Sequence, residues 1–175
     1  MIEKAIGTCV LSADEIDEGV KCVAAQLNGQ FKRAVVVVVV PGGIIFSADL
    51  LRQLNFDVVM ETISCPHTPG ERHNPSPIVF HPNVPLAGED IILVDDAIES
   101  GGTMKRLVAH LRSHYAVNSI SVATLFVKPG RVAVGAQEYY GMAMQSDELL
   151  VGYGLPWAHK NRNLPYIARL KNISE

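Results

Sequence analysis

The residues best suited to chemistry lie in one short stretch, residues 91–103, which reads IILVDDAIESGGT. Its four apolar residues predict a strand buried on both faces, and Asp95 and Asp96 follow directly. A small Gly-rich turn over 99–103 then leads into a helical pattern. Such a turn lets backbone N–H groups approach phosphate oxygens, and the helix N-terminus adds partial positive charge. The stretch therefore suits a phosphorylated ligand, whereas the paired carboxylates suit ribose hydroxyls or a metal ion. Any strand-to-helix turn of a nucleotide-binding α/β domain remains an alternative.

A second strand, turn and helix precede this stretch. Residues 34–40 are almost all valine, which predicts a central strand covered on both faces. Pro41, Gly42 and Gly43 close it, and residues 44–54 are predicted to form a helix. The turn either binds a ligand through its backbone or is only a tight turn.

The remaining periodicity defines the elements that must position these turns. A capping box at Ser12 and Glu15 begins an amphipathic helix predicted over 13–28. Strands are predicted over 56–63 and 119–127, with a short one over 139–144. Alternating strands and helices predict an α/β fold, with a mainly parallel twisted sheet flanked by helices. Ligands of such sheets bind at the carboxyl ends of the strands, where these turns would lie.

Residues 64–85 interrupt this alternation. They hold six of the ten prolines and three of the six histidines, which predicts a long, functional loop. A zinc site could be built from Cys65, His67, His73 and His81, but their spacing matches no standard ligand pattern. We therefore expect these four to be surface residues of the loop.

Composition limits the class of protein. The 175 residues, 48% of them hydrophobic, are enough for one domain with a full core. A net charge of −3 indicates no general attraction to nucleic acid or to an anionic membrane. No apolar run reaches the roughly 18 residues needed to span a bilayer. Three scattered cysteines argue against a disulfide framework, so we expect a soluble, cytoplasmic protein.

The 91–103 stretch resembles the signature of type I phosphoribosyltransferases, which bind phosphoribosyl pyrophosphate (PRPP). Near the C-terminus, VGYG followed by RNLPYI within residues 151–167 resembles a motif of the hypoxanthine–guanine branch. The matches run in family order from about residue 34 to 170. The resemblance implies a type I phosphoribosyltransferase fold in one domain, 1–175. It also implies a small hood formed by the chain ends, about 1–12 and 145–175.

The resemblance assigns roles at the donor end of the site. The ribose of PRPP would be held by Asp95 and Asp96, which would also contact Mg²⁺ indirectly. The 5′-phosphate would be held by Glu99, Ser100, Gly101, Gly102 and Thr103. The pyrophosphate would be held by Pro41, Gly42, Gly43 and Arg162, the last through its forked donors.

It also assigns roles at the base end. Glu99 would act as the catalytic base toward the purine. Lys128 matches the lysine that donates to the purine 6-oxygen, which selects an oxo over an amino group. Leu149 matches a position that stacks on the purine, and Leu150 one that pairs with it through the backbone. Trp157 either packs at the pocket rim or fills the core.

Four positions depart from the family pattern. Glu99 replaces an aspartate, and Leu149 replaces an aromatic residue. Pro156 replaces an aspartate that helps to hold magnesium, and its side chain offers no ligand. Ser64-Cys65 stands where a Ser-Tyr pair begins the closing loop. These departures spare the phosphoribosyl-phosphate cradle and affect the purine, metal and loop positions.

The sequence therefore predicts a purine salvage enzyme. It would transfer phosphoribose from magnesium-bound PRPP to N9 of hypoxanthine or guanine, giving IMP or GMP and pyrophosphate. One alternative is a weak or inactive relative that binds nucleotide or PRPP as a regulator; another is a transferase for a different base such as xanthine. The resemblance further suggests a homodimer or homotetramer.

Overall fold

The structure is a computed structural model, which describes residues 4–66 and 75–172. Within these residues the main sheet has five parallel strands, in the order β3-β2-β4-β5-β6. They are β2 (Arg33–Val40), β3 (Asp57–Ser64), β4 (Asp90–Ile98), β5 (Ser119–Val127) and β6 (Gln137–Ala143). The predicted α/β fold with a mainly parallel sheet is confirmed.

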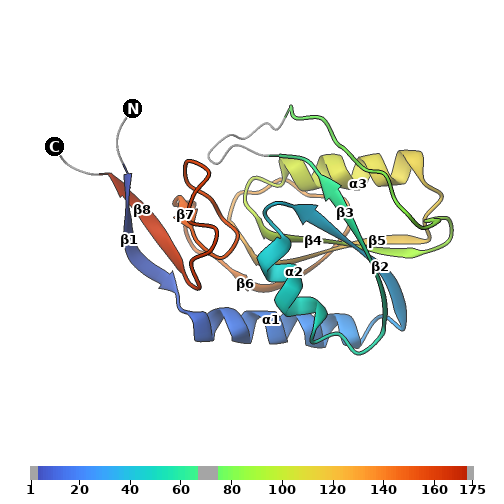
Figure 1. The fold of residues 1–175 in the computed structure, drawn as a ribbon, viewed down its shortest axis with the longest axis horizontal. Helices are drawn as coiled ribbons and strands as arrows, with labels where there is room; N and C mark the ends of the chain where they lie inside the picture. Colours follow the sequence, from blue (N-terminus) through green and yellow to red (C-terminus); the bar gives the residue numbers. More distant parts are fainter. Residues whose placement is uncertain (1–3, 67–74, 173–175) are drawn as a thin grey trace.

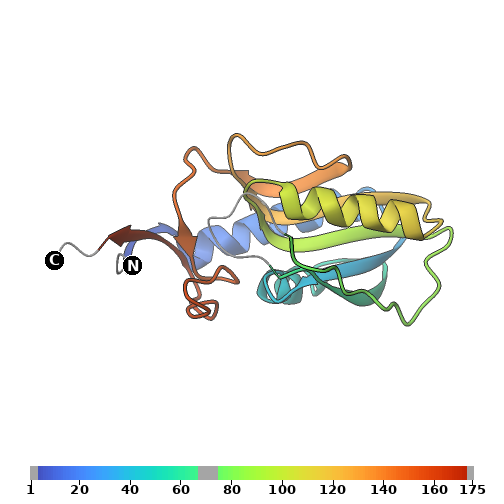
Figure 2. The same cartoon turned by 90° about the horizontal axis from the view of Figure 1, so that it is seen from above.

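Helices cover both faces of this sheet (Figures 1 and 2). Helix α1 (Ala13–Asn28) and helix α2 (Ile44–Leu51) lie on one face, and α3 (Gly102–His114) lies on the other. The valine run explains the arrangement, because successive side chains of a strand point to opposite faces. Val36 and Val38 pack with α1 and α2, whereas Val35 and Val37 pack with α3. All four are at most 3% exposed, as expected for a central strand.

A second, smaller sheet joins the two chain ends. In the described part of the chain it is antiparallel, in the order β1-β8-β7, with β1 (Lys4–Leu11), β7 (Leu150–Val151) and β8 (Ile167–Asn172). It lies at one end of the molecule, beside the carboxyl ends of the main strands (Figure 1). We call β1, β7, β8 and residues 152–166 the hood. The sequence did not predict β1, because its pairing partner β8 is about 160 residues away.

Several boundaries differ from those predicted. Helix α2 ends at Leu51 rather than at residue 54, and β6 begins at Gln137. Val79 and Asn83 anchor the described residues that precede β4 to the domain: Val79 pairs with Ser64, and the buried Glu61 carboxylate accepts from the backbone N–H of Asn83 at 2.8 Å.

The expectation that Cys65 lies on the surface is wrong. It is 2% exposed, because it packs into the core between the sheet and α3. His81 is exposed as expected, and His67 and His73 lie outside the described residues. Among the residues that are described, no group of three or more His, Cys, Asp or Glu could hold a metal ion. Nor does any helix in that part of the chain have the length and apolarity needed to cross a membrane.

Candidate active site

The predicted site residues meet at the carboxyl ends of β2, β4 and β5, which are neighbours in the sheet. One pocket there is lined by most of them: Pro41, Gly42, Asp95, Asp96, Glu99, Ser100, Gly101, Thr103, Leu149, Leu150 and Arg162. Gly43, Gly102 and Lys128 do not line it directly. Pro156 and Trp157 do, so Trp157 lies at the pocket rather than only in the core. The motifs thus converge at the edge where parallel sheets bind ligands.

The turn after β4 has the geometry of an anion site. Gly101, the N-cap of α3, has φ +82° and no side chain to bond the helix start, where the Gly102 N–H makes a long hydrogen bond of 3.4 Å to Ser100 Oγ. The first turn of α3 contains no acidic residue. A Cβ at Gly101 would lie 2.6 Å from the Val132 carbonyl oxygen, so only glycine fits this turn. The positive end of α3 therefore faces the pocket without a competing carboxylate from its own first turn.

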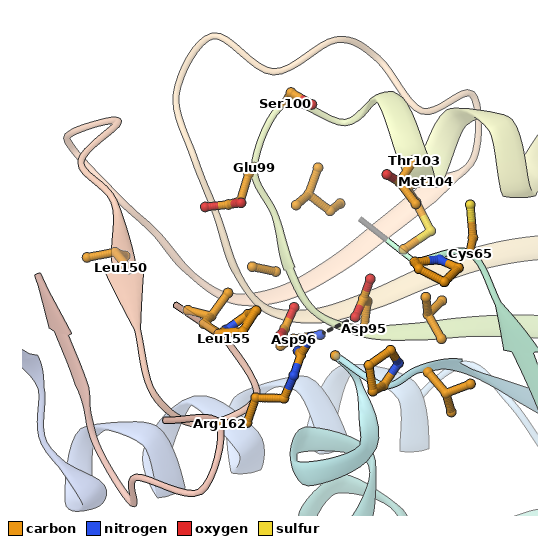
Figure 3. Close-up of a pocket in the computed structure, with 18 of the residues that line it drawn as sticks. Cys65, Asp95, Asp96, Glu99, Ser100, Thr103, Met104, Leu150, Leu155 and Arg162 are labelled. Atoms are coloured by element: carbon orange, nitrogen blue, oxygen red, sulfur yellow. Dashed lines mark hydrogen bonds between the residues drawn. The ribbon is translucent and has the colours of Figure 1, made fainter. Parts of the chain in front are cut away.

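Asp95 and Asp96 lie between this turn and the turn after β2. Burial, then repulsion from Asp96, raises the pKa of Asp95 well above its usual value. Burial, then the nearby Glu99 carboxylate, raises the pKa of Asp96 to about 7. Arg162 opposes both shifts, and it reaches toward the two carboxylates in Figure 3. The acidic groups of the site therefore repel one another, and Arg162 offsets only part of that repulsion.

The turn after β2 packs closely against these carboxylates. The Val40–Pro41 peptide bond is cis. A Cβ at Gly42 would lie 2.9 Å from Asp95 Oδ1, so a side chain there would displace the acid. On the hood side, Arg162 Nη1 donates to the Gly154 carbonyl oxygen, which fixes the guanidinium beside the turn. Two distant parts of the chain thus form one wall of the pocket.

Lys128 does not line the pocket directly, but it is bound to Glu99, which does. Its Nζ lies 2.6 Å from Glu99 Oε1 and donates to the Glu148 carbonyl oxygen at 2.7 Å. The lysine is 2% exposed, so an ion pair and a carbonyl compensate a buried ammonium. Sequence reasoning placed both residues at the base end, and it missed their direct contact because they end different strands. A purine reaching Lys128 would therefore have to share or replace these bonds.

Other residues of the pocket were not assigned a binding role from the sequence. Cys65, Met104, Leu155 and Leu170 also line it. Leu155 directly follows the VGYG motif, which could have indicated it. Leu170 belongs to β8, and no sequence signal placed that strand over the site. The apolar part of the wall comes partly from the chain end.

Comparison with known proteins agrees with this geometry. Residues 12–155 match the model of the phosphoribosyl transferase domain. The chain therefore belongs to the phosphoribosyl transferase domain family, and it is a transferase enzyme.

Its relatives define the branch of that family. A curated hypoxanthine-guanine phosphoribosyltransferase of Streptococcus pneumoniae is 31% identical over 175 residues, covering 98% of this chain and 97% of the relative. A crystal structure of such an enzyme from Bacillus anthracis is 33% identical, with a TM-score of 0.85, and covers 97% of this chain and 100% of its own. A hypoxanthine-guanine-xanthine phosphoribosyltransferase structure is 26% identical, with a TM-score of 0.81, over 95% of this chain and 98% of its own. The resemblance noted in the sequence is confirmed.

Proposed function

We propose that this enzyme transfers the phosphoribosyl group of PRPP to N9 of hypoxanthine or guanine, releasing pyrophosphate. The observation that carries the proposal is the Lys128–Glu99 pair beside the donor cradle. A donor for the purine 6-oxygen and an acceptor for a purine proton meet there. The curated relatives, named hypoxanthine-guanine phosphoribosyltransferases, support the same substrates.

The donor would occupy the cradle formed by the two turns. The 5′-phosphate would bind residues 99–103, where Gly101 is the N-cap of α3 and offers no side chain of its own to the helix start. Asp95 and Asp96 would accept hydrogen bonds from the ribose hydroxyls. The turn at 41–43 and Arg162 would hold the pyrophosphate, the first by a backbone N–H group and the second by its forked donors. Pro41 has no N–H, and the Gly43 N–H already donates to the Val39 carbonyl oxygen at 2.8 Å, so the Gly42 N–H would be the donor from this turn.

The base would bind between Leu149 and Lys128. Lys128 would donate to the 6-oxygen, in place of one of its present bonds, and so disfavour a 6-amino group. Glu99, released from part of that ion pair, would take the purine proton as N9 attacks the ribose. Leu150 is placed in β7 next to this position, where its backbone could pair with the base edge.

The site also fits a magnesium ion that arrives with the donor. Asp96 is buried and Asp95 is half-buried, both have raised pKa values, and Arg162 acts against both shifts, so a divalent cation would relieve the repulsion among these carboxylates. Two carboxylates with substrate oxygens are a usual magnesium environment. Pro156 lines the pocket and adds no side-chain ligand. Magnesium would neutralise charge on the leaving pyrophosphate.

Steady-state assays with PRPP, Mg²⁺ and four bases would test this function. We expect IMP and GMP to form from hypoxanthine and guanine, and adenine to react at least tenfold less efficiently, because its 6-amino group cannot accept from Lys128. Absence of nucleotide above background with both hypoxanthine and guanine would contradict the proposal.

Xanthine is the second candidate base. Leu149 and Pro156 line the pocket in place of the family's aromatic and acidic residues, so the base end differs from the pattern that the resemblance implies. A relative of similar fold is named for xanthine as well. A higher kcat/KM for xanthine than for hypoxanthine in the same assays would favour this alternative.

Binding of nucleotide without turnover would instead favour a regulatory relative.

We further propose a cytoplasmic homodimer or homotetramer. The three cysteines form no pattern of a disulfide framework, which supports a reducing compartment. Ile44 on α2 is 47% exposed and Met60 on the edge strand β3 is 59% exposed, so both could be covered in an oligomer. Light scattering of the purified protein would give the assembly size.

A further inference from the structure

A hydrogen bond joins the hood to α2 behind the pocket. The Tyr153 hydroxyl donates to Asp49 Oδ2 at 2.6 Å, across 104 residues of sequence. Tyr153 is 5% exposed, and burial followed by the bond to Asp49 raises its pKa. The hydroxyl therefore stays protonated and keeps donating to the carboxylate, a charge-assisted bond of the stronger kind. The loop after β7 lies next to α2 in Figures 1 and 2.

The backbone around Tyr153 is in an uncommon conformation. Gly152, Tyr153 and Gly154 have φ values of 105°, 47° and 101°. Glycine adopts such angles freely, but a tyrosine does so only where its surroundings hold it. Tyr153 packs in the core and makes two hydrogen bonds: its backbone N–H donates to the Leu164 carbonyl oxygen at 2.9 Å, and its hydroxyl donates to Asp49.

This conformation places Gly154 directly against the donor cradle. A Cβ at Gly154 would lie 2.5 Å from the Gly42 carbonyl oxygen and 2.9 Å from Asp96 Oδ2. The Gly154 carbonyl oxygen accepts from Arg162, and the Gly154 N–H donates to the Arg162 carbonyl oxygen at 2.9 Å. A displacement of Tyr153 would therefore move the backbone that holds Arg162.

Asp49 is equally tied to the other side of the cradle. Helix α2 begins directly after the 41–43 turn, and the Ser47 N–H donates to the Gly43 carbonyl oxygen at 2.8 Å. The turn and Asp49 thus belong to one short helical unit. The hydrogen bond from Tyr153 links this helical unit to the hood. Neither Tyr153 nor Asp49 lines the pocket.

We propose that Tyr153 and Asp49 are positioning residues for the pyrophosphate end of the donor. Their hydrogen bond holds Gly154 and Arg162 at a fixed distance from the 41–43 turn. This inference rests on the proposed function, because it assigns the pyrophosphate to that turn and to Arg162.

The test compares two ligands that differ at that end. IMP shares the ribose and 5′-phosphate with PRPP and carries no pyrophosphate. By isothermal titration with Mg²⁺, we expect Tyr153→Phe to weaken PRPP binding about five- to tenfold, less than the direct loss of a hydrogen bond to a charged group, because Tyr153 does not itself contact the ligand. IMP binding should change less than about twofold, since the 99–103 turn is untouched.

Matched variants at α2 separate the bond from general packing. Asp49→Ala should weaken PRPP binding as much as Tyr153→Phe, and the double variant should be no weaker than either single one. Asp49→Asn keeps an acceptor oxygen and should restore most of the affinity. Arg52→Ala is the control, because Arg52 donates to Asp49 Oδ1 at 2.6 Å, on the other oxygen, and is largely exposed.

Each outcome is decisive. Equal losses for PRPP and IMP would mean that the bond only stabilises the fold, and wild-type affinities in both variants would mean that it positions nothing. Either result overturns the inference and leaves the proposed function standing. A wild-type protein that binds neither ligand would overturn the proposed function, and this inference with it.

Discussion

The donor end and the base end of the pocket are built in different ways. The donor end combines two backbone turns, at 41–43 and at 99–103 before α3, with the side chains of Asp95, Asp96 and Arg162. The base end consists of side chains, with Lys128, Glu99 and Leu149 arriving from three segments. The departures from the family pattern at Glu99, Leu149 and Pro156 are changes of side chain. A backbone cradle tolerates few substitutions, whereas side chains at the base end can change and alter the preferred base without altering the fold.

The largest effect is expected on kcat, from a substitution at the base end alone. Replacing Glu99 with Gln removes the carboxylate that would take the purine proton, so kcat should fall about 10²- to 10⁴-fold. PRPP affinity should change little, since the donor cradle keeps its backbone. Rapid-quench kinetics and PRPP titration measure the two quantities. Glu18→Gln on the exposed face of α1 is the control. A kcat for Glu99→Gln within threefold of wild type would show that Glu99 is not the catalytic base.

The next effect concerns recognition of the 6-oxygen. Lys128→Met should raise the KM for hypoxanthine about 10- to 100-fold, because a hydrogen bond from a charged donor is lost. Discrimination against adenine should shrink as well. Lys32→Met is the matched control, because Lys32 directly precedes β2, at the edge of the sheet away from the pocket. Unchanged selectivity between hypoxanthine and adenine would show that Lys128 has only a structural role.

A third effect separates stability from function at the donor end. The pKa of Asp96 is raised from 3.8 to about 7, so the folded state binds a proton more tightly than the unfolded state. Stability from this group is full below about pH 4 and is lost as the pH rises to about 7. The shift corresponds to at most about 4 kcal/mol. Asp96→Asn should therefore raise the free energy of unfolding at pH 8 by about 1–2 kcal/mol while impairing catalysis.

Urea denaturation at pH 5 and at pH 8 checks this. The gain from Asp96→Asn should be larger at pH 8, because the wild-type carboxylate is charged there. Asp57→Asn, at the exposed start of β3, should show no such difference. A loss of stability from Asp96→Asn at pH 8 would mean that Arg162 balances the buried charge.

The smallest effect is expected on the KM for hypoxanthine, from a substitution at the base end. Leu149→Phe should restore an aromatic contact to the purine worth about 1 kcal/mol, which lowers the KM for hypoxanthine about fivefold. Leu149→Met, of similar volume, should leave it unchanged. A higher KM with Phe would indicate that Leu149 shapes the pocket for a different ligand position.

The contrast between the two ends also explains how far the sequence could be interpreted. The valine run and the 91–103 stretch carry their structure locally, so β2, β4, α3 and both turns were predictable. The hood strand β1 and the Tyr153–Asp49 bond depend on segments more than 100 residues apart, which no local pattern encodes. The Lys128–Glu99 pair and the burial of Cys65 likewise follow from strand order and from packing against α3. The roles of individual site residues stay predictions until they are tested.

The most direct test of 6-oxopurine transfer is a titration of the wild-type protein with PRPP and Mg²⁺, followed by addition of hypoxanthine to the same complex while pyrophosphate release is measured. We predict saturable PRPP binding, and pyrophosphate release that begins only when the purine is added and is nearly abolished in Glu99→Gln. PRPP binding with no release on adding hypoxanthine, guanine or xanthine would contradict it.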